Sequence, residues 1–262
     1  MANGAASAIG RGAAESRASA SIPPVELSEI VPVPGVGRIY EETFRVGLGD
    51  AAPSGRVRMD AIARWVQDLA YADVDDAGVV EQSAWVVRRM RIRAERFPRF
   101  GERVYGLTFC SGYGRLWAER RVRFETETGL VDVTGVWVHL NPQSRLPAPL
   151  PESFDDFYAQ SAQGRKVKAR LRHPNPTGDE PRTTWFFRAT DADIAEHVNN
   201  AAYWEPLEEL LAERPEPESL DAEIEFREPA QPGPALILNG ENGALWITAE
   251  DGRIHASLAF PE

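Results

Sequence analysis

Residues 191–204 read DADIAEHVNNAAYW and place a carboxylate, Asp193, and an imidazole, His197, four residues apart and directly before an asparagine pair. The preceding TTWFFRAT alternates bulky apolar with polar or small residues, which predicts a strand. The following AAYWEPLEELLAE predicts a helix, because apolar residues recur at helical spacing and Asn199 or Asn200 can cap its first free amides. The local order is therefore strand, acidic loop and helix.

A loop of this kind places Asp193 and His197 beside the N-terminus of a helix. Unpaired backbone N–H groups and the positive end of the helix dipole stabilise negative charge on a reacting oxygen there. The stretch therefore predicts a site suited to acyl transfer.

The same order occurs earlier in the chain, which predicts an internal repeat. YEETFRVGL predicts a strand, and MDAIARWVQDLAYA predicts a helix with Ile62, Val66 and Leu69 on one face. Asp50 is expected at the place of Asp193. GRLW and GALW, one in each half, both open a stretch with period two. Further strands are predicted near residues 84–93, 102–111, 114–125 and 131–140 in the first half, and near residues 222–228, 234–240, 243–249 and 252–260 in the second.

A long helix followed by an antiparallel meander is best stabilised when the sheet wraps around the helix. We therefore expect an α+β fold with two such halves, at residues 38–141 and 181–262, the second of which holds the site. The segment 142–180 is rich in proline and is expected to be a linker with a short helix around DDFYAQSAQ. Residues 1–37 are expected to form a disordered tail.

These elements resemble the acyl-acyl carrier protein (acyl-ACP) thioesterases of plants and bacteria, which are tandem hotdog folds. The resemblance covers roughly residues 38 to 262. SGRVRMDAIARWVQD is similar to a segment of the family's first hotdog. The most specific similarity is to the family's run of aspartate, histidine, valine, two asparagines and a tyrosine, here Asp193, His197, Val198, Asn199, Asn200 and Tyr203.

The resemblance implies hydrolysis of a fatty acyl thioester, most directly acyl-ACP, to a free fatty acid. Asp193 is expected to act as general base toward water, or alternatively as nucleophile. His197 is expected to orient the thioester or water and to protonate the leaving thiolate. Asn199 is expected to fix the loop, and backbone amides at the start of the helix to hold the oxyanion, at about 3 kcal/mol per donor. The residues expected to bind substrate are Asn200, Tyr203, Trp65, Leu69 and Trp85, the last three because the family's first hotdog holds the acyl tail.

Three positions depart from the family pattern. The plant enzymes carry an asparagine two residues before the histidine, where this chain has Ala195. They also carry a glutamate and then a cysteine on a later strand, where this chain has Pro229 and Ala230. Glu228 replaces the lost carboxylate only if the strand shifts by one residue, which turns its side chain to the other face of the sheet.

These departures keep two other classes of function open. One is a related enzyme, either an acyl-CoA thioesterase or a double-hotdog hydratase, although the HVNN run and the spacing of four between aspartate and histidine count against hydration. The other is a hotdog protein that binds an acyl thioester without hydrolysing it. One fold hosts all of these functions, so the site has to decide between them.

The distribution of charge suggests the partner. The formal net charge of −11 disfavours general attraction to nucleic acid. Within RRMRIRAERFPRFGER, period two places Arg89, Arg91 and Arg93 on one face while Met90 and Ile92 face inward. Acyl carrier protein is acidic, so this basic strip, with GRKVKARLR beyond it, is expected to dock the carrier. The alternative is a solvated strand face.

Other signals set limits on the protein class. The chain has one cysteine and no apolar run long enough to span a membrane, and its first residues lack the apolar core of a secretory signal, which together favour the cytoplasm. No glycine-rich phosphate-binding pattern follows a strand and no metal-ligand spacing is evident, so no cofactor is expected. Both a monomer and a homodimer are compatible with the sequence.

Overall fold

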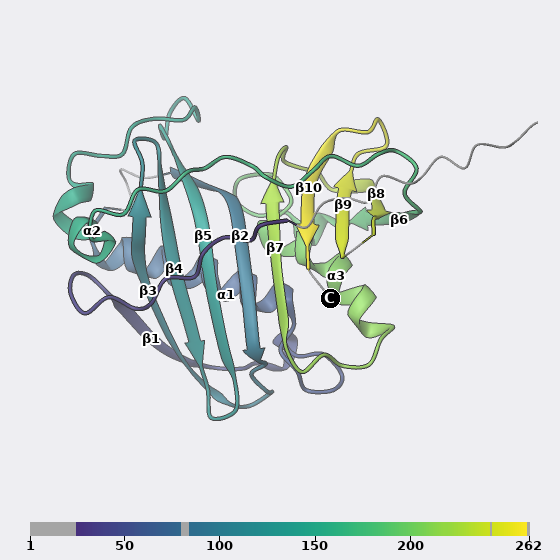
Figure 1. The fold of residues 1–262 in the computed structure, drawn as a ribbon, viewed down its shortest axis with the longest axis horizontal. Coiled ribbons are helices and arrows are strands. Elements are labelled where there is room, and N and C mark those ends of the chain that lie inside the picture. Colours follow the sequence, from purple (N-terminus) through teal and green to yellow (C-terminus); the bar gives the residue numbers. More distant parts are fainter. Residues whose placement is uncertain (1–24, 80–83, 242, 261–262) are drawn as a thin grey trace, which may run out of the picture.

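The computed structural model describes residues 25–79, 84–241 and 243–260. Its strands form one ten-stranded antiparallel sheet in the order β1-β3-β4-β5-β2-β7-β10-β9-β8-β6 (Figure 1). The pairing of β2 with β7, from Arg89 opposite Glu225 to Ala94 opposite Leu220, joins the two halves. The first half holds β1 (Tyr40–Arg45), β2 (Ala84–Arg96), β3 (Arg103–Tyr113), β4 (Trp117–Glu125) and β5 (Leu130–Leu140); the second holds β6 (Arg182–Phe187), β7 (Leu220–Phe226), β8 (Gly233–Asn239), β9 (Ala244–Thr248) and β10 (Ile254–Ala259).

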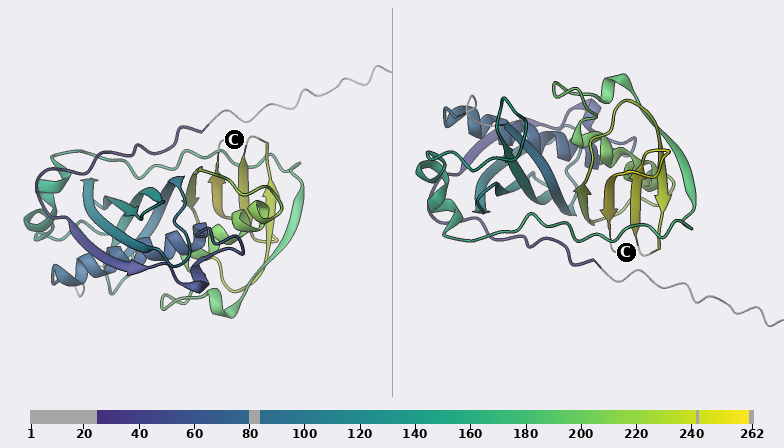
Figure 2. Two further views of the ribbon diagram at one scale, coloured as in Figure 1. Left: turned by 90° about the horizontal axis from the view of Figure 1, so that it is seen from below. Right: turned by 90° about the horizontal axis from the view of Figure 1, so that it is seen from above.

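The concave face of the sheet holds the long helix α1 (Met59–Asp76) of the first half and the shorter helix α3 (Glu205–Ala212) of the second (Figures 1 and 2). Each half thus follows the predicted order of strand, helix and four strands. The sequence predicted one continuous second helix, but Asn200–Trp204 form the 3₁₀ turn η4 before α3 begins. Pro206 is the reason, since proline is tolerated only in the first turn of an α-helix, where its missing N–H has no partner to lose.

Apolar side chains from both helices fill the space under the sheet. Trp65 of α1 makes edge contacts with Phe44 and Phe124, whose ring centroids lie 5.0 and 5.5 Å from its own. In the second half, the ring of Tyr203 makes an edge contact with Phe226 and a tilted contact with Phe187. Both halves therefore bury aromatic rings between helix and sheet, which fixes each helix and the loop that precedes it.

The two loops before the helices repeat each other bond for bond, and this corrects one expectation. Arg58 N–H donates to Asp50 O at 2.9 Å, and Asn199 N–H donates to Asp191 O at 2.7 Å. The side chains of Asp50 and Asp191 also accept equivalent bonds, from Gly47 N–H and Arg188 N–H. Asp50 therefore corresponds to Asp191, not to Asp193 as the sequence suggested.

The bridges of Ala51 with Val57 and of Ala192 with Val198 extend the same register. In this register Ala52 stands at the place of Asp193, Arg56 at that of His197 and Arg58 at that of Asn199. The first loop thus has the backbone of the second but none of its three polar side chains. The sequence aligned Asp50 with Asp193 because both the turn and the proposed site of the second loop contain an aspartate. Spacing along the chain does not distinguish these two aspartates.

The outer, convex face of the sheet is covered by two extended segments, residues 25–31 and 165–174 (Figure 1). Ser28 is buried there, and Val31 O accepts a hydrogen bond from Arg121 of β4. The predicted tail, residues 1–37, therefore does not extend to residues 25–31, which pack on the sheet; residues 1–24 lie outside the described residues. The predicted short helix in the linker is confirmed as α2 (Phe154–Ala162).

Two buried carboxylates of β7 hold these segments in place. All four oxygens of Glu223 and Glu225 accept hydrogen bonds, at 2.7 to 2.9 Å, from Ser28 N–H, Arg172 N–H and Nη2, and His173 N–H. The His173 ring lies close enough to both carboxylates for the three to hold a metal ion. Because the carboxylates already bind N–H donors and the Arg172 cation, we interpret the cluster as an attachment of the covering segments to the sheet.

Replacing Glu223 by glutamine should lower stability at neutral pH and flatten its dependence on pH. Burial alone raises the pKa of this carboxyl, but the hydrogen bonds from His173 and Ser28 and the charge of Arg172 outweigh it and lower the pKa from 4.5 to about 2. A carboxyl with a lowered pKa stabilises the fold above its unfolded pKa and loses that effect as pH falls toward about 2. We expect a loss of about 3 kcal/mol at pH 7.

Urea unfolding at pH 7, 5 and 3.5 measures this effect. The control is Glu250→Gln, which removes an exposed carboxylate and should leave the free energy of unfolding unchanged. A Glu223→Gln variant that keeps the full decline of wild-type stability between pH 5 and 3.5 would show that other groups cause it.

Candidate active site

Backbone and side-chain hydrogen bonds fix the Asp193 carboxylate at both oxygens. Asp193 Oδ1 accepts from Ala195 N–H at 2.8 Å, and Oδ2 accepts from Asn199 Nδ2 at 2.9 Å. The loop itself is closed by a bond of 3.0 Å from Asp193 N–H to His197 O. Glu196 has a positive φ of 63°, the counterpart of Gly55 with φ of 86° in the first loop. This tight turn brings Asp193 and His197 together.

Asn199 links the loop to the helices on both sides. It is the N-cap of η4, since its Oδ1 accepts from Ala201 N–H at 2.8 Å. The same amide exchanges two hydrogen bonds with Gln67 of α1: Gln67 Nε2 donates to Asn199 Oδ1 at 3.0 Å, and Asn199 Nδ2 donates to Gln67 Oε1 at 3.2 Å. Asn199 therefore both fixes the loop and caps the turn, so of the two asparagines that could have capped it, Asn199 does so. Sequence reasoning missed Gln67, which lies in a helix without any local motif.

Tyr203 stabilises the Asp193 loop through its side-chain hydroxyl. Its buried hydroxyl accepts a hydrogen bond of 2.8 Å from Ala230 N–H, and Ala230 O in turn accepts from Val198 N–H at 3.0 Å. Burial raises the pKa of Tyr203 to about 12, although the bond from Ala230 acts in the opposite direction. The tyrosine therefore stays protonated and ties the segment after β7 to the Asp193 loop.

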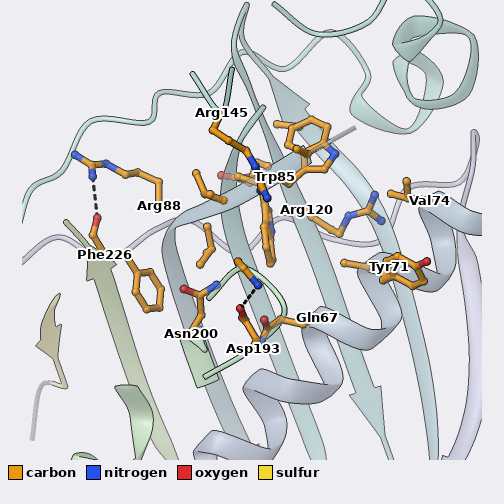
Figure 3. A pocket seen from close by; sticks show the side chains of 18 of the residues that line it. Gln67, Tyr71, Val74, Trp85, Arg88, Arg120, Arg145, Asp193, Asn200 and Phe226 are labelled. Carbon is orange, nitrogen blue, oxygen red and sulfur yellow. Dashed lines mark hydrogen bonds between the residues drawn. The ribbon is translucent and has the colours of Figure 1, made fainter. Parts of the chain in front are cut away.

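A cavity of about 640 Å³ opens beside this loop and extends into the first half. Figure 3 shows Asp193 and Asn200 close to Gln67, with Tyr71 and Val74 farther along α1. Its volume lies in the range of small-ligand sites. His197 and Tyr203 also line the cavity, together with the aromatic side chains of Trp85, Phe154, Phe157 and Tyr158 from β2 and α2.

Only one of the three expected pocket residues of the first half lines the cavity. Trp85 lines the cavity, whereas Trp65 and Leu69 are buried in the core under the sheet and do not line it. Gln67, Tyr71 and Val74 line the cavity from a neighbouring face of the same helix. The sequence could not separate these faces, because each residue of a helix turns by about 100° and both faces contact protein.

Comparison with known proteins identifies the family. Residues 37–158 match the acyl-ACP thioesterase N-terminal domain, and residues 175–244 match the acyl-ACP thioesterase C-terminal domain. The chain belongs to the acyl-ACP thioesterase family. An uncharacterized protein of Mycobacterium tuberculosis is 25% identical to this family member over 215 residues, which cover 81% of this chain and 86% of that protein.

Plant relatives match over a shorter part of their own length. The chloroplastic palmitoyl-acyl carrier protein thioesterase of Arabidopsis thaliana is 24% identical over 200 residues, which cover 64% of this chain and 48% of that protein. This family member thus aligns with about half of the plant protein.

Solved structures confirm the double hotdog fold. An acyl-ACP thioesterase from Bacteroides thetaiotaomicron superposes with a TM-score of 0.70 at 18% identity, over 85% of this chain and 97% of that one. The 12:0-ACP thioesterase from Umbellularia californica superposes with a TM-score of 0.66 at 19% identity, over 87% of this chain and 98% of that one. In the part of the chain that the structure describes, no helix is long and apolar enough to cross a membrane.

The departures of this family member from the plant pattern lie on the cavity wall or beneath it. Pro229 and Glu228 line the cavity, and Ala230 is buried behind Tyr203. Glu228 is half exposed and lies 3.6 Å from Arg253. Ala195 contributes its backbone N–H to Asp193, a bond that any residue except proline can supply. The cavity therefore keeps a second carboxylate, but on a more exposed part of its wall.

The single cysteine also lines the cavity. Burial raises the pKa of the Cys110 thiol to about 11, so the thiolate needed for a nucleophile is scarce at neutral pH. Cys110 packs against Phe154 and Tyr158, as expected for a residue that fills the core.

The expected carrier-docking face of β2 is not a free surface. Met90 and Ile92 do face the core, but Arg89 is 6% exposed and donates to Lys168 O and Arg170 O of the covering segment. Arg91 pairs with Asp221 at 2.5 Å, and Arg93 pairs with Glu95. Arg89 and Arg91 are occupied by the segments that cover the outer face of the sheet, which period two in the sequence does not indicate. The expectation that they dock a carrier is therefore wrong for the buried Arg89 and unsupported for the other two.

Proposed function

We propose that this protein hydrolyses fatty acyl-ACP thioesters at the Asp193 loop and releases free fatty acid. The observation that carries the proposal is the Asp193 carboxylate, held at both oxygens by Ala195 and Asn199 beside a cavity that is lined by residues of both halves. Each oxygen of a carboxylate has a further lone pair available for a water molecule. The acyl chain would occupy the part of the cavity between Tyr71 and Trp85.

In the proposed reaction, Asp193 removes a proton from water as the water oxygen bonds to the thioester carbonyl carbon. The C–S bond of the resulting tetrahedral intermediate then breaks, and the proton passes through His197 to the leaving thiolate. Ala201 N–H and Ala202 N–H already donate to Asn199. We therefore assign the oxyanion to the N–H and side-chain amide of Asn200, which lines the cavity.

The carrier would dock on a basic stripe formed by Lys166, Lys168 and Arg170, which replaces the β2 arginines as the docking site. All three are exposed and alternate along the covering segment. The segment continues to His173, whose carbonyl oxygen accepts from Arg227 on the cavity wall at 2.9 Å. In a chain of net charge −11, this local concentration of positive charge on the covering segment suits an acidic carrier.

Thiol release from acyl-ACP and from acyl-CoA of several chain lengths tests the reaction and the carrier together. The double variant Lys168→Glu with Arg170→Glu should lower kcat/KM for acyl-ACP by about tenfold or more, since it reverses the charge that attracts the carrier. The kcat/KM for acyl-CoA should change by less than about twofold.

The matched control is Arg45→Glu with Arg182→Glu, which makes the same change of charge at the two edge strands of the sheet. An equal loss for acyl-ACP in the control, or an equal loss for both carriers in the stripe variant, would contradict docking at the stripe. If the wild-type protein releases thiol from neither carrier yet binds the acyl thioester, hydrolysis is wrong and a sequestering function is favoured, with Pro229 at the family's glutamate place as its cause.

A further inference from the structure

In each half, one helix reaches the loop of the other half. Gln67 stands nine residues after Arg58, the N-cap of α1, and Glu208 stands nine residues after Asn199, the N-cap of η4. Gln67 contacts the second loop through Asn199. Glu208 contacts the first loop through Arg56 and Met59 N–H. The two residues are therefore equivalent positions of the repeat, and each one crosses the boundary between the halves.

The side chains at these two positions differ in charge, and each suits the residue that it contacts in the opposite loop. Glu208 is a carboxylate and neutralises the buried Arg56 with a contact of 2.6 Å. Gln67 is an amide and meets another amide, Asn199, which itself donates to Asp193. A carboxylate at position 67 could not donate to Asn199 Oδ1, and its charge would oppose the ionised form of Asp193 nearby.

The hydrogen bonds of the Asn199 amide leave it only one orientation. Its Oδ1 accepts from Gln67 Nε2 and Ala201 N–H, and its Nδ2 donates to Gln67 Oε1 and Asp193 Oδ2. Ala201 N–H can only donate and the Asp193 carboxylate can only accept, so a flipped amide would lose both bonds. Gln67 supplies two of the four bonds and is the only one of these partners that comes from the first half.

We infer that Gln67 is a positioning residue of the active site: it holds the Asn199 amide, and through it the Asp193 carboxylate, in the orientation that hydrolysis needs. The inference rests on the proposed function. It also gives the first half a part in the reaction, although the sequence placed the site in the second half. Without Gln67 the Asn199 amide can rotate, and displacements of about 1 Å at a catalytic group lower rates by up to about 100-fold.

The test compares Gln67→Met, which keeps the length of the side chain without its hydrogen bonds, with Gln67→Glu, which keeps the acceptor and loses the donor. For both we expect kcat for acyl-thioester hydrolysis to fall by about 10- to 100-fold while KM changes by less than about threefold. Asp68→Asn, at the neighbouring exposed position of α1, should keep wild-type kcat. A merely structural role would lower the Tm and leave the kcat of the folded protein unchanged.

The outcomes separate this inference from the proposed function. If Asp193→Asn is inactive while Gln67→Met and Gln67→Glu keep wild-type kcat, the positioning role is overturned and the assigned site stands. Should Asp193→Asn retain full activity, the site itself is wrong and the role of Gln67 fails with it. If Gln67→Met does not fold, the near-isosteric Gln67→Glu decides alone.

Discussion

The Asp193→Asn protein should release thiol from acyl-ACP at least about 1000-fold more slowly than the wild type, the largest effect expected of any single substitution here. Asparagine keeps the size of the side chain but cannot take a proton from water. Its NH2 group must also face one of two donors, Ala195 N–H or Asn199 Nδ2, each of which needs an acceptor. Steady-state kcat with saturating acyl-ACP measures the loss, and Asp193→Ala confirms that it does not arise from the new amide.

Two comparisons make this result specific. Asp251→Asn removes an exposed aspartate far along the chain, in the turn before β10, and should leave kcat unchanged. The second comparison is Glu228→Gln, because Glu228 also lines the cavity and its carboxylate is half exposed. The third carboxylate on the cavity wall, Glu119, is buried and paired with Arg165. If Asp193→Asn keeps more than about a tenth of wild-type kcat and Glu228→Gln loses activity instead, the general base is Glu228.

Removing the charge of Glu208 should destabilise the fold more than any other change proposed for this protein. Arg56 and Glu208 form a contact of 2.6 Å, with side chains only 5% and 9% exposed. Glu208→Gln leaves the guanidinium buried without a counter-ion, and breaking a buried pair in this way costs about 3–5 kcal/mol. We expect the Tm to fall on the order of 10 °C, as measured by circular dichroism.

The neighbouring Glu209→Gln is the matched control, because Glu209 is exposed on the same helix and should change the Tm by little. Replacing both partners, as Arg56→Met with Glu208→Leu, should recover much of the lost stability, since apolar side chains of similar volume avoid the unpaired charge. A Tm for Glu208→Gln equal to that of Glu209→Gln would contradict a stabilising pair. The pair also gives the first loop a structural role, because Arg56 stands at the place of His197 and Glu208 neutralises its charge.

The strand order along the chain was predictable because each strand carries its own period-two pattern. β2 through β5 lie within a few residues of the predicted ranges, as do β7 through β10. The long helix was predictable from the common face of Ile62, Val66 and Leu69, all buried. The second helix was predicted too long, since its first turn becomes 3₁₀ ahead of Pro206.

Contacts between distant segments account for what the sequence did not reveal. The alternation of Arg89, Met90 and Arg91 correctly indicated the two faces of β2, but not that residues 25–31 and 165–174 cover the outer one. A period of two reports that a face is polar; it does not report what lies against that face. The same limit applies to His173, which has no acidic neighbour in the sequence and lies beside Glu223 in the structure.

By itself, the sequence determined the two-part hotdog plan and, for the proposed site, the nearness of Asp193, His197 and Asn199, because these residues lie within one loop whose turn is set by neighbouring residues. The tertiary structure alone decided which residue orients that loop. Gln67 is 132 residues from Asn199 and meets it only when the helix of the first half packs against the loop of the second. Local patterns encode periodicity and turns, whereas a hydrogen bond across the chain depends on how the two halves pack together.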